Sequence, residues 1–250
     1  MTDIHTHILP AVDDGAQSME IALEMLELSA ERGTGRVLLT PHANVDDFEA
    51  DTEDIITAFE HFREAAVKRG IPVELALGME VFADRDFQDC LDEENLLTMN
   101  DSDYMLVEIP FHAEESFLWS VLEQIRCRGL WPILAHAERY DCIQRHPEIA
   151  YQLNREEVGI QINQGSLFGR FGQTSYEIAH LLLDCSLVQF VATDCHGLSA
   201  RTPGLDRAWD YICKKYSKGY AELLLNLNPE RLWNNREILF INPRNPRRFR

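Results

Sequence analysis

The chain has 250 residues, of which 42 are acidic and 23 are basic, giving a formal charge of −19 at pH 7. Hydrophobic residues make up 45% and charged residues 26%, an ordinary globular composition that excludes a disordered or collagen-like chain. So acidic a protein lacks the field of lysine and arginine that neutralises phosphates, and we expect no nucleic-acid partner. The basic run at residues 244–250 is short and terminal, and we interpret it as a solvated end.

The six cysteines contain no CxxC pair, which is unlike a zinc ribbon or a secreted disulfide framework. No basic stretch followed by an apolar run comes after Met1, and no apolar run approaches the ~20 residues needed to span a bilayer. We therefore expect a cytoplasmic, reduced protein without membrane insertion.

Short runs rich in Val, Ile and Leu alternate along the chain with longer amphipathic segments. The runs are almost continuously apolar, as expected of strands buried on both faces, and the longer segments carry the broad apolar face of helices. In chain order, the expected strands are residues 3–8, 37–40, 73–79, 104–109, 131–135, 159–163 and 188–193, and the expected helices are residues 18–32, 51–69, 116–128, 148–153, 175–184 and 205–216.

This alternation predicts parallel strands joined by right-handed crossovers. Glycines follow three of the expected helices, in Arg32-Gly33, Arg69-Gly70 and Arg128-Gly129, where a helix commonly ends. No linker, repeat or composition shift interrupts the run of strands. We expect one α/β domain with a closed or nearly closed barrel.

Histidines and carboxylates gather at the ends of the expected strands. His5 and His7 point to one side of the first strand, because alternate residues of a strand share a face. Six of the seven expected strands place such a side chain at or near the carboxyl end, where α/β barrels build their active sites. The candidate set is His5, His7, Asp14, His42, Glu80, Glu108, His136, Asp194 and His196.

Five imidazoles and four carboxylates without thiolates suit borderline and hard divalent ions such as Mn, Fe or Zn. Nine ligands are enough for two or three ions. Clustered divalent ions lower the pKa of water and clamp the oxygens of a phosphoryl displacement, and their charge lets an anion bind an acidic protein. Asp13 competes with Asp14 for the same role, and spacing does not separate them.

Two arginines lie close to these ligands in sequence. Arg139 follows His136 by three residues and Arg201 follows His196 by five, so that either can reach over bound ions and hold phosphate oxygens bidentately. The alternative is an ordinary salt bridge, for example with Glu138 or Asp206.

Cys195 and Arg201 also fit Cys-x5-Arg, the signature of cysteine-dependent tyrosine phosphatases. In those enzymes, a thiolate of depressed pKa attacks phosphorus. Here alternation points Cys195 away from the two neighbouring ligands, so we expect it to be buried behind its strand.

The motifs together resemble the complete set of the polymerase and histidinol phosphatase (PHP) superfamily. Within it they look like the bacterial metal-dependent protein tyrosine phosphatases of capsule and exopolysaccharide loci, through Asp3-Ile4-His5-Thr6-His7-Ile8-Leu9-Pro10, Val12-Asp13-Asp14-Gly15, Thr40-Pro41-His42, Gly78-Met79-Glu80, Ala135-His136-Ala137-Glu138-Arg139-Tyr140 and Ala192-Thr193-Asp194-Cys195-His196. The resemblance covers the chain to about residue 233 and leaves about 234–250 as a tail. It implies a single domain with a distorted, TIM-like (β/α)7 barrel and three divalent ions, usually described as manganese.

The same resemblance implies which side chains hold each ion. One ion would be held by His5, His7, Glu80 and Asp194, and Glu80 would bridge to a second ion held by Glu108 and His136. The third would be held by Asp14, His42 and His196. Arg139 and Arg201 match the positions that bind the phosphate and act in catalysis.

The function that the resemblance implies is hydrolysis of phosphotyrosine in proteins by a metal-activated hydroxide, without a phosphoenzyme. The implied partner is the tyrosine-rich tail of a bacterial polysaccharide-assembly kinase. Three alternatives stay open: a phosphatase of histidinol phosphate or a sugar phosphate, a catalytically silent metal-binding regulatory module, and a carbon–nitrogen amidohydrolase. The amidohydrolase is disfavoured because no lysine lies near the end of the fourth expected strand.

Overall fold

The computed structural model describes residues 1–43, 50–84, 87–92 and 96–249. Its strands pair in parallel in two sheets, with the orders β1-β2-β4 and β3-β5-β6-β7-β8-β9. The strands are β1 (Thr2–Asp3), β2 (Arg36–Leu39), β3 (His42–Ala43), β4 (Glu74–Leu77), β5 (Glu80–Phe82), β6 (Tyr104–Glu108), β7 (Trp131–Leu134), β8 (Gly159–Asn163) and β9 (Phe190–Ala192).

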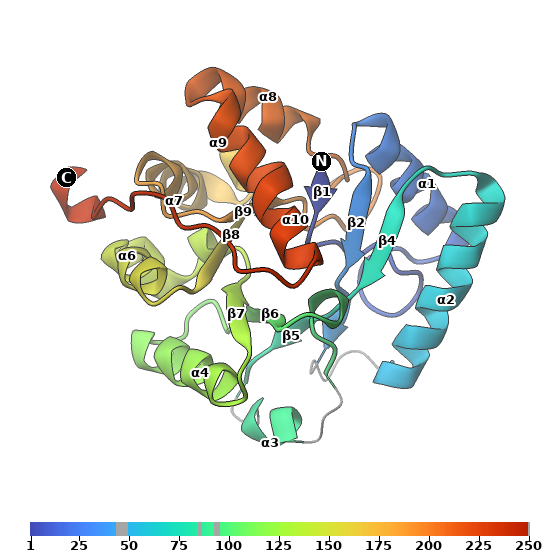
Figure 1. The fold of residues 1–250 in the computed structure, drawn as a ribbon, viewed down its shortest axis with the longest axis horizontal. Helices are drawn as coiled ribbons and strands as arrows, with labels where there is room; N and C mark the ends of the chain where they lie inside the picture. The colour runs from blue at the N-terminus through green and yellow to red at the C-terminus, as the bar shows by residue number, and fades with distance from the viewer. Residues whose placement is uncertain (44–49, 85–86, 93–95, 250) are drawn as a thin grey trace.

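The two sheets are parts of one curled sheet. Hydrogen bonds from Gly78 N to the Leu39 carbonyl (2.9 Å) and from Glu80 N to the Pro41 carbonyl (3.0 Å) carry the pairing across the breaks between β2 and β3 and between β4 and β5. At the other edge, Thr6 and Cys195 form an isolated parallel bridge. Counting β2 with β3 and β4 with β5, seven strand segments follow one another around a distorted barrel (Figure 1), and the expected fold class is confirmed.

Two details of the expected strands are different in the structure. The segments at 37–40 and 73–79 are each interrupted and then resume as β3 and β5. The run expected at 3–8 is regular only at Thr2–Asp3, and beyond that it meets the last strand through the Thr6 bridge. Pro41 has no N–H to offer a neighbouring strand, which is one physical reason for the first interruption.

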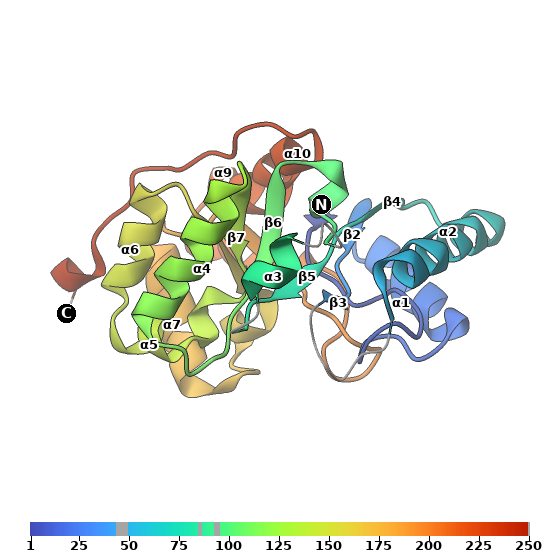
Figure 2. The ribbon, with the colours of Figure 1, turned by 90° about the horizontal axis from the view of Figure 1, so that it is seen from below.

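The helices surround the strands in both views (Figures 1 and 2), and the six expected helices are present with ends shifted by up to three residues. Local signals explain their limits: the Asp51 side chain accepts from Asp54 N at the start of α2, and Gly70 ends it in the left-handed region at φ +73°. The helices are α1 (Met19–Glu31), α2 (Thr52–Arg69), α3 (Phe87–Asp92), α4 (Glu115–Cys127), α5 (Asp141–Arg145), α6 (Glu148–Arg155), α7 (Gly172–Asp184), α8 (Asp206–Lys215), α9 (Lys218–Glu222), a π turn (Leu223–Leu227), α10 (Asn228–Trp233) and short 3₁₀ turns at Met99–Asp101, Ala137–Arg139, Gln164–Phe168 and Pro246–Phe249.

A small apolar cluster fills the barrel and is separate from the larger cluster between strands and outer helices. Leu232 of α10 and the chain that follows it close the amino ends of the strands. There the Tyr104 hydroxyl accepts a hydrogen bond from Ile238 N (3.0 Å) and donates one to the Arg236 carbonyl (3.1 Å). The cluster within the barrel contains Ile4, Leu38, Ala76, Met99, Tyr104, Leu106, Ile133, Ala135, Phe190, Ala192, Leu232 and Ile238.

The end of the chain packs more closely than expected. Arg244 N donates to the Cys185 carbonyl (2.8 Å), and the Arg247 guanidinium forms an ion pair with Glu148 on α6 (2.7 Å). Pro246 between them is buried. Arg244 and Arg247 are exposed, as a solvated end requires, but carbonyl and carboxylate acceptors on the outer helices also anchor these two residues.

Candidate metal centre

The nine predicted ligand side chains come together at the carboxyl ends of the strands. Glu80, at the start of β5, lies at the centre of the group. Its Oε2 is 3.1 Å from His5 Nε2, 3.3 Å from His7 Nε2 and 3.2 Å from His42 Nδ1. Its Oε1 is 2.9 Å from His136 Nε2. Glu80 is buried, so these imidazoles replace water around its carboxylate.

Asp194 faces the same two histidines from the end of β9. Its Oδ1 lies 3.5 Å from His5 Nε2 and 3.4 Å from His7 Nε2, and its Oδ2 accepts a hydrogen bond from Asn163 Nδ2 (2.6 Å). The Arg201 guanidinium forms an ion pair with the Asp194 carboxylate and donates to the Asp194 carbonyl (2.9 Å). Arg201 is thus directed at the cluster rather than at Asp206.

The two neighbouring aspartates of the first loop take different positions. Asp14 Oδ1 lies 3.2 Å from His196 Nε2 and 3.6 Å from His42 Nε2. Asp13 Oδ2 instead contacts His7 Nδ1 at 2.7 Å, on the opposite side of that ring from Glu80. A carboxylate on the second nitrogen of a ligating histidine fixes its tautomer and raises its basicity. The geometry gives Asp13 this orienting position and leaves Asp14 facing the other ligands.

Within the described residues, three groups of donor atoms could each hold a metal ion, with their atoms within 4.8 Å of one another. His42 belongs to two of the groups, because its two nitrogens face opposite sides. In the expected arrangement His42 serves only the third ion, so the structure adds a second place for it. The groups are His5, His7 and Glu80; His42, Glu80 and Glu108; and His7, Asp14, His42 and His196.

Two buried amides on β8 support the cluster and were not anticipated from the sequence. Gln161 Oε1 accepts from His136 N (2.8 Å) and lies 3.1 Å from His5 Nδ1, while Gln161 Nε2 donates to Asn163 Oδ1 (2.8 Å). An oxygen on Nδ1 places the His5 proton there and turns the lone pair of Nε2 toward Glu80. The available signal was two amides at alternate positions of an otherwise apolar strand.

Electrostatics favour a cation in this cluster. Burial, together with the Glu80 and Asp194 carboxylates, raises the pKa of Glu108 to about 9. Burial also opposes ionisation of Asp194, yet His5, His7 and Arg201 hold the pKa of its carboxyl well below the ordinary value. A buried set of carboxylates and imidazoles needs either a proton or a metal ion to balance its charge. The nitrogen and oxygen donors present fit divalent ions.

Backbone strain marks two of the predicted ligands. His136 and Asp194 adopt φ values of +31° and +50°, in a region that residues other than glycine rarely occupy. Each such residue costs about 1–3 kcal/mol and persists where the surroundings impose it, most often at functional sites. Each residue lies two positions beyond the end of a barrel strand, where the turn brings its side chain into the cluster.

Arg139 has no acidic partner within the described part of the chain. Its guanidinium lies 4.3 Å from the centre of the Phe111 ring and 4.6 Å from that of Phe171, so it is held between two aromatic faces. Glu138, the alternative partner considered from the sequence, is buried and accepts from Ser166 Oγ (2.5 Å) and Asn163 N (3.1 Å). A half-buried, stacked guanidinium keeps its planar donors available to an anion.

Cys195 is buried, as expected, and burial raises the pKa of its thiol to about 12. A cysteine nucleophile needs the opposite, an accessible thiolate of lowered pKa. The Cys-x5-Arg pattern therefore does not form the phosphate-binding loop of a cysteine-dependent phosphatase.

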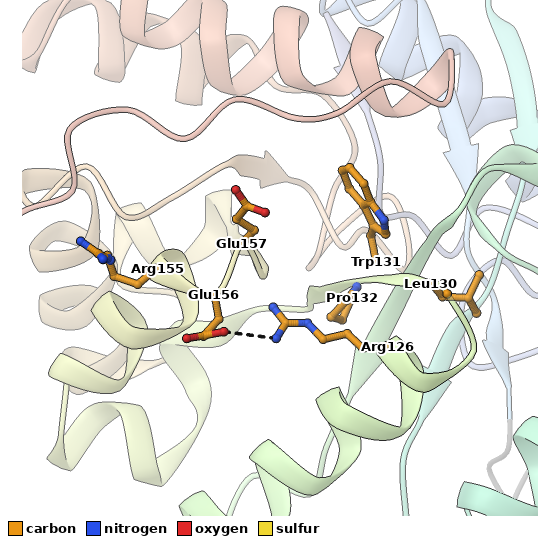
Figure 3. Close-up of a pocket in the computed structure, with 8 residues that line it drawn as sticks. Arg126, Leu130, Trp131, Pro132, Arg155, Glu156 and Glu157 are labelled. Atoms are coloured by element: carbon orange, nitrogen blue, oxygen red, sulfur yellow. Dashed lines mark ion pairs between the residues drawn. The ribbon is translucent and has the colours of Figure 1, made fainter.

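A cavity beside the start of β7, away from these ligands, holds about 390 Å³ (Figure 3). It has mixed charge, and Arg126 is paired with Glu156 at 3.6 Å. It lies at the amino-end face of the barrel, whereas α/β barrels build their active sites at the carboxyl ends of the strands. Among the described residues, no helix has the length and apolarity needed to cross a membrane.

Comparison with known proteins finds relatives along nearly the whole chain. The family described as "Capsular polysaccharide synthesis, CpsB/CapC" matches residues 1–234. Tyrosine-protein phosphatase YwqE of Bacillus subtilis is 30% identical over 238 residues, covering 95% of this chain and 93% of its own length. Tyrosine-protein phosphatase CpsB of Streptococcus pneumoniae is 32% identical, with 93% and 98% covered.

Solved structures extend the comparison to the fold. One from the work on YwqE and CpsB, described as unique metal-dependent tyrosine phosphatases, superimposes with a TM-score of 0.90 at 29% identity, covering 98% of this chain and 99% of that one. A lactonase from Listeria monocytogenes shares only the fold, at a TM-score of 0.56, 13% identity and coverage of 93% of this chain and 94% of that one. The chain belongs to the CpsB/CapC family of capsular polysaccharide synthesis.

Proposed function

We propose that the protein is a metal-dependent phosphatase of phosphotyrosine in proteins. The observation that carries the proposal is the Arg139 guanidinium, which is held between Phe111 and Phe171 without an acidic partner among the described residues. It lies close enough to Glu108 and His136 to influence the pKa of both. A phosphate bound to it would reach the metal-type side chains. The names of the relatives YwqE and CpsB support the same activity.

The proposed cofactors are three divalent ions, Mn²⁺ first, with Fe or Zn as alternatives. Glu80, Asp194 and the five histidines, with Asp14 and Glu108, would hold them. Bound, such ions lower the pKa of water and neutralise phosphate charge. Asp13 and Gln161 orient His7 and His5, and Arg139 binds two phosphate oxygens through its planar donors. A metal ion held by Asp194 would take the place of the Arg201 guanidinium, which would then be available to bind the phosphate.

The surroundings of Arg139 suit an aryl phosphate better than a sugar phosphate. Phe111 and Phe171 flank Arg139 and are half-buried, and the phenyl ring of phosphotyrosine offers an apolar surface to pack against the exposed part of these rings. A sugar would bring hydroxyls that these rings do not satisfy. Aromatic side chains next to the phosphate-binding arginine thus favour phosphotyrosine over histidinol phosphate or a sugar phosphate.

The proposed partner is the phosphorylated tail of a tyrosine kinase of capsular or exopolysaccharide synthesis. The support is the family description, which names capsular polysaccharide synthesis. The proposed compartment is the cytoplasm, because Cys127, Cys142, Cys185, Cys195 and Cys213 are free thiols.

The test combines elemental analysis of gently purified protein with hydrolysis of a phosphotyrosine peptide and of histidinol phosphate. Two to three metal ions per chain, activity lost to a chelator and restored by Mn²⁺, and preference for the peptide are expected. Asp194→Ala should abolish turnover while circular dichroism shows the fold retained. Chelator-resistant turnover would contradict the metal mechanism, and strong preference for histidinol phosphate would contradict the substrate.

A further inference from the structure

A second, positively charged cavity adjoins the metal centre. It holds about 430 Å³, and the basic side chains in its lining are Arg32, Arg170, Arg201 and Arg207. No Asp or Glu lines it within the described part of the chain. In a protein with 42 acidic and 23 basic residues, four arginines in one cavity without a carboxylate are a strong departure from the average surface. Such a concentration of one charge creates a local field that attracts anions.

The arginines are positioned by their surroundings. The Arg207 guanidinium lies 4.2 Å from the centre of the Phe168 ring, and Arg32 Nη1 donates to the Pro203 carbonyl at 2.7 Å. A Cβ on Gly165 would approach Arg170 Cδ to 3.1 Å, so the absence of a side chain there leaves room for the arginine stem. Arg170 and Arg207 form no ion pair with the described residues, and both are exposed. Their guanidinium donors remain available.

Shared residues connect this cavity to the metal centre. Arg201 lines the cavity and also pairs with Asp194. Phe171 lines it and also contacts the Arg139 guanidinium. Phe171 also precedes α7, whose first turn carries no acidic residue and no side-chain cap, so the positive end of that helix lies at the cavity. A group in the cavity would thus sit next to the phosphate held by Arg139.

We propose that this arginine-lined cavity is a specificity subsite for an anionic side chain that flanks the phosphotyrosine in the same polypeptide. The proposal rests on the proposed function and deepens it. Arg170 and Arg207 supply the charge that distinguishes an acidic flank from a neutral one, while Arg201 separates the subsite from the metal centre. The ligand is a carboxylate or a phosphate, both of which the planar donors of arginine bind bidentately.

The test compares three phosphotyrosine peptides of one sequence, with glutamate, glutamine or phosphoserine at the flanking positions. For the metal-loaded protein, kcat/KM for an anionic peptide should exceed that for the glutamine peptide by about tenfold, the size of one charge-assisted contact. Arg207→Gln should reduce this ratio, and Arg170→Gln/Arg207→Gln should bring it close to one. Arg155→Gln is the control: it makes the same charge change at an exposed residue of the cavity beside β7, and it should leave the ratio unchanged.

The two anionic peptides distinguish the two possible ligands. If only the glutamate peptide is hydrolysed with a higher kcat/KM than the glutamine peptide, the ligand is a carboxylate. If only the phosphoserine peptide is, the ligand is a phosphate. A ratio near one for the unmodified protein, or an unchanged ratio in the double variant, overturns the subsite. If no peptide is hydrolysed, the proposed function fails, and the subsite is judged by fluorescence anisotropy with the same labelled peptides. Tighter binding of the anionic peptides that the double variant loses supports the subsite, and equal binding refutes it.

Discussion

Replacing Gln161 with leucine tests whether the amides of β8 hold the metal ligands in place. The side chain is fully buried, and its removal leaves three polar groups without a partner: His136 N, His5 Nδ1 and Asn163 Oδ1. Each buried group that loses its hydrogen bond costs about 1–3 kcal/mol, so the free energy of unfolding should fall by about 3 kcal/mol. Loss of an outer partner of a ligating histidine also weakens metal binding by about 10–100-fold.

The assays are urea unfolding of the metal-free protein and titration with Mn²⁺ of the same variant. Gln173→Leu is the matched control, because Gln173 is exposed on α7 and its amide donates to Glu177 (2.7 Å) on the helix surface. We expect its unfolding free energy to change by no more than about 0.5 kcal/mol. If Gln161→Leu behaved like this control in both assays, the supporting role of the β8 amides would be refuted.

The remaining predictions concern the phosphate, the metals, the thiol and a distant histidine. Arg139→Lys should raise KM strongly with unchanged metal content, because an ammonium cannot stack between Phe111 and Phe171 and bind bidentately; an unchanged KM would exclude Arg139 from substrate binding. Chelation should lower thermal stability, by about 2.7 kcal/mol for ions present at 100 times their Kd, and a melting temperature insensitive to chelator and Mn²⁺ would count against the cluster. Iodoacetamide should leave the folded enzyme active, because Cys195 is buried; rapid inactivation that tracks its alkylation would restore it as a nucleophile. Burial and the Lys215 ammonium lower the pKa of His180, so the folded state favours its neutral imidazole. The free energy of unfolding should therefore fall as pH drops below 6.5, the ordinary pKa of histidine. Lys215→Gln should raise the pKa of His180 in an NMR titration.

The sequence was sufficient for the barrel and for the residues that gather at one end of it. Apolar runs, amphipathic segments and helix-ending glycines are local signals, and six strands end in a histidine or carboxylate. Because parallel strands bring their carboxyl ends to one edge, local spacing alone predicts a common site. The distances among Glu80, His42 and Asp194 then follow from the closure of the barrel.

Other features depend on contacts between distant parts of the chain. Ile238 lies in a short segment after α10, where its backbone N donates to the Tyr104 hydroxyl 134 residues earlier and its side chain joins the cluster within the barrel. No local pattern indicates such a partner. Asp13 and Asp14 are chemically identical neighbours, and only the position of His7 Nδ1 separates their roles. The second place for His42 likewise requires the three-dimensional position of Glu108.

The junction between the first and last strands has a consequence for how the protein acquires its site. Asp3 accepts hydrogen bonds from the backbone and hydroxyl of Thr193, 190 residues away, and His5 and His7 meet Asp194 only where these two ends join. A ribosome must therefore release nearly the whole chain before the ligand set exists, and such long-range closure is slow. The groups His5, His7 and Glu80 and His42, Glu80 and Glu108 come from the first 108 residues, whereas Asp194 and His196 join them only when the last strand closes the barrel. Closure of the barrel would therefore complete the ligand set, and ions held with Asp194 and His196 would stabilise the closed form.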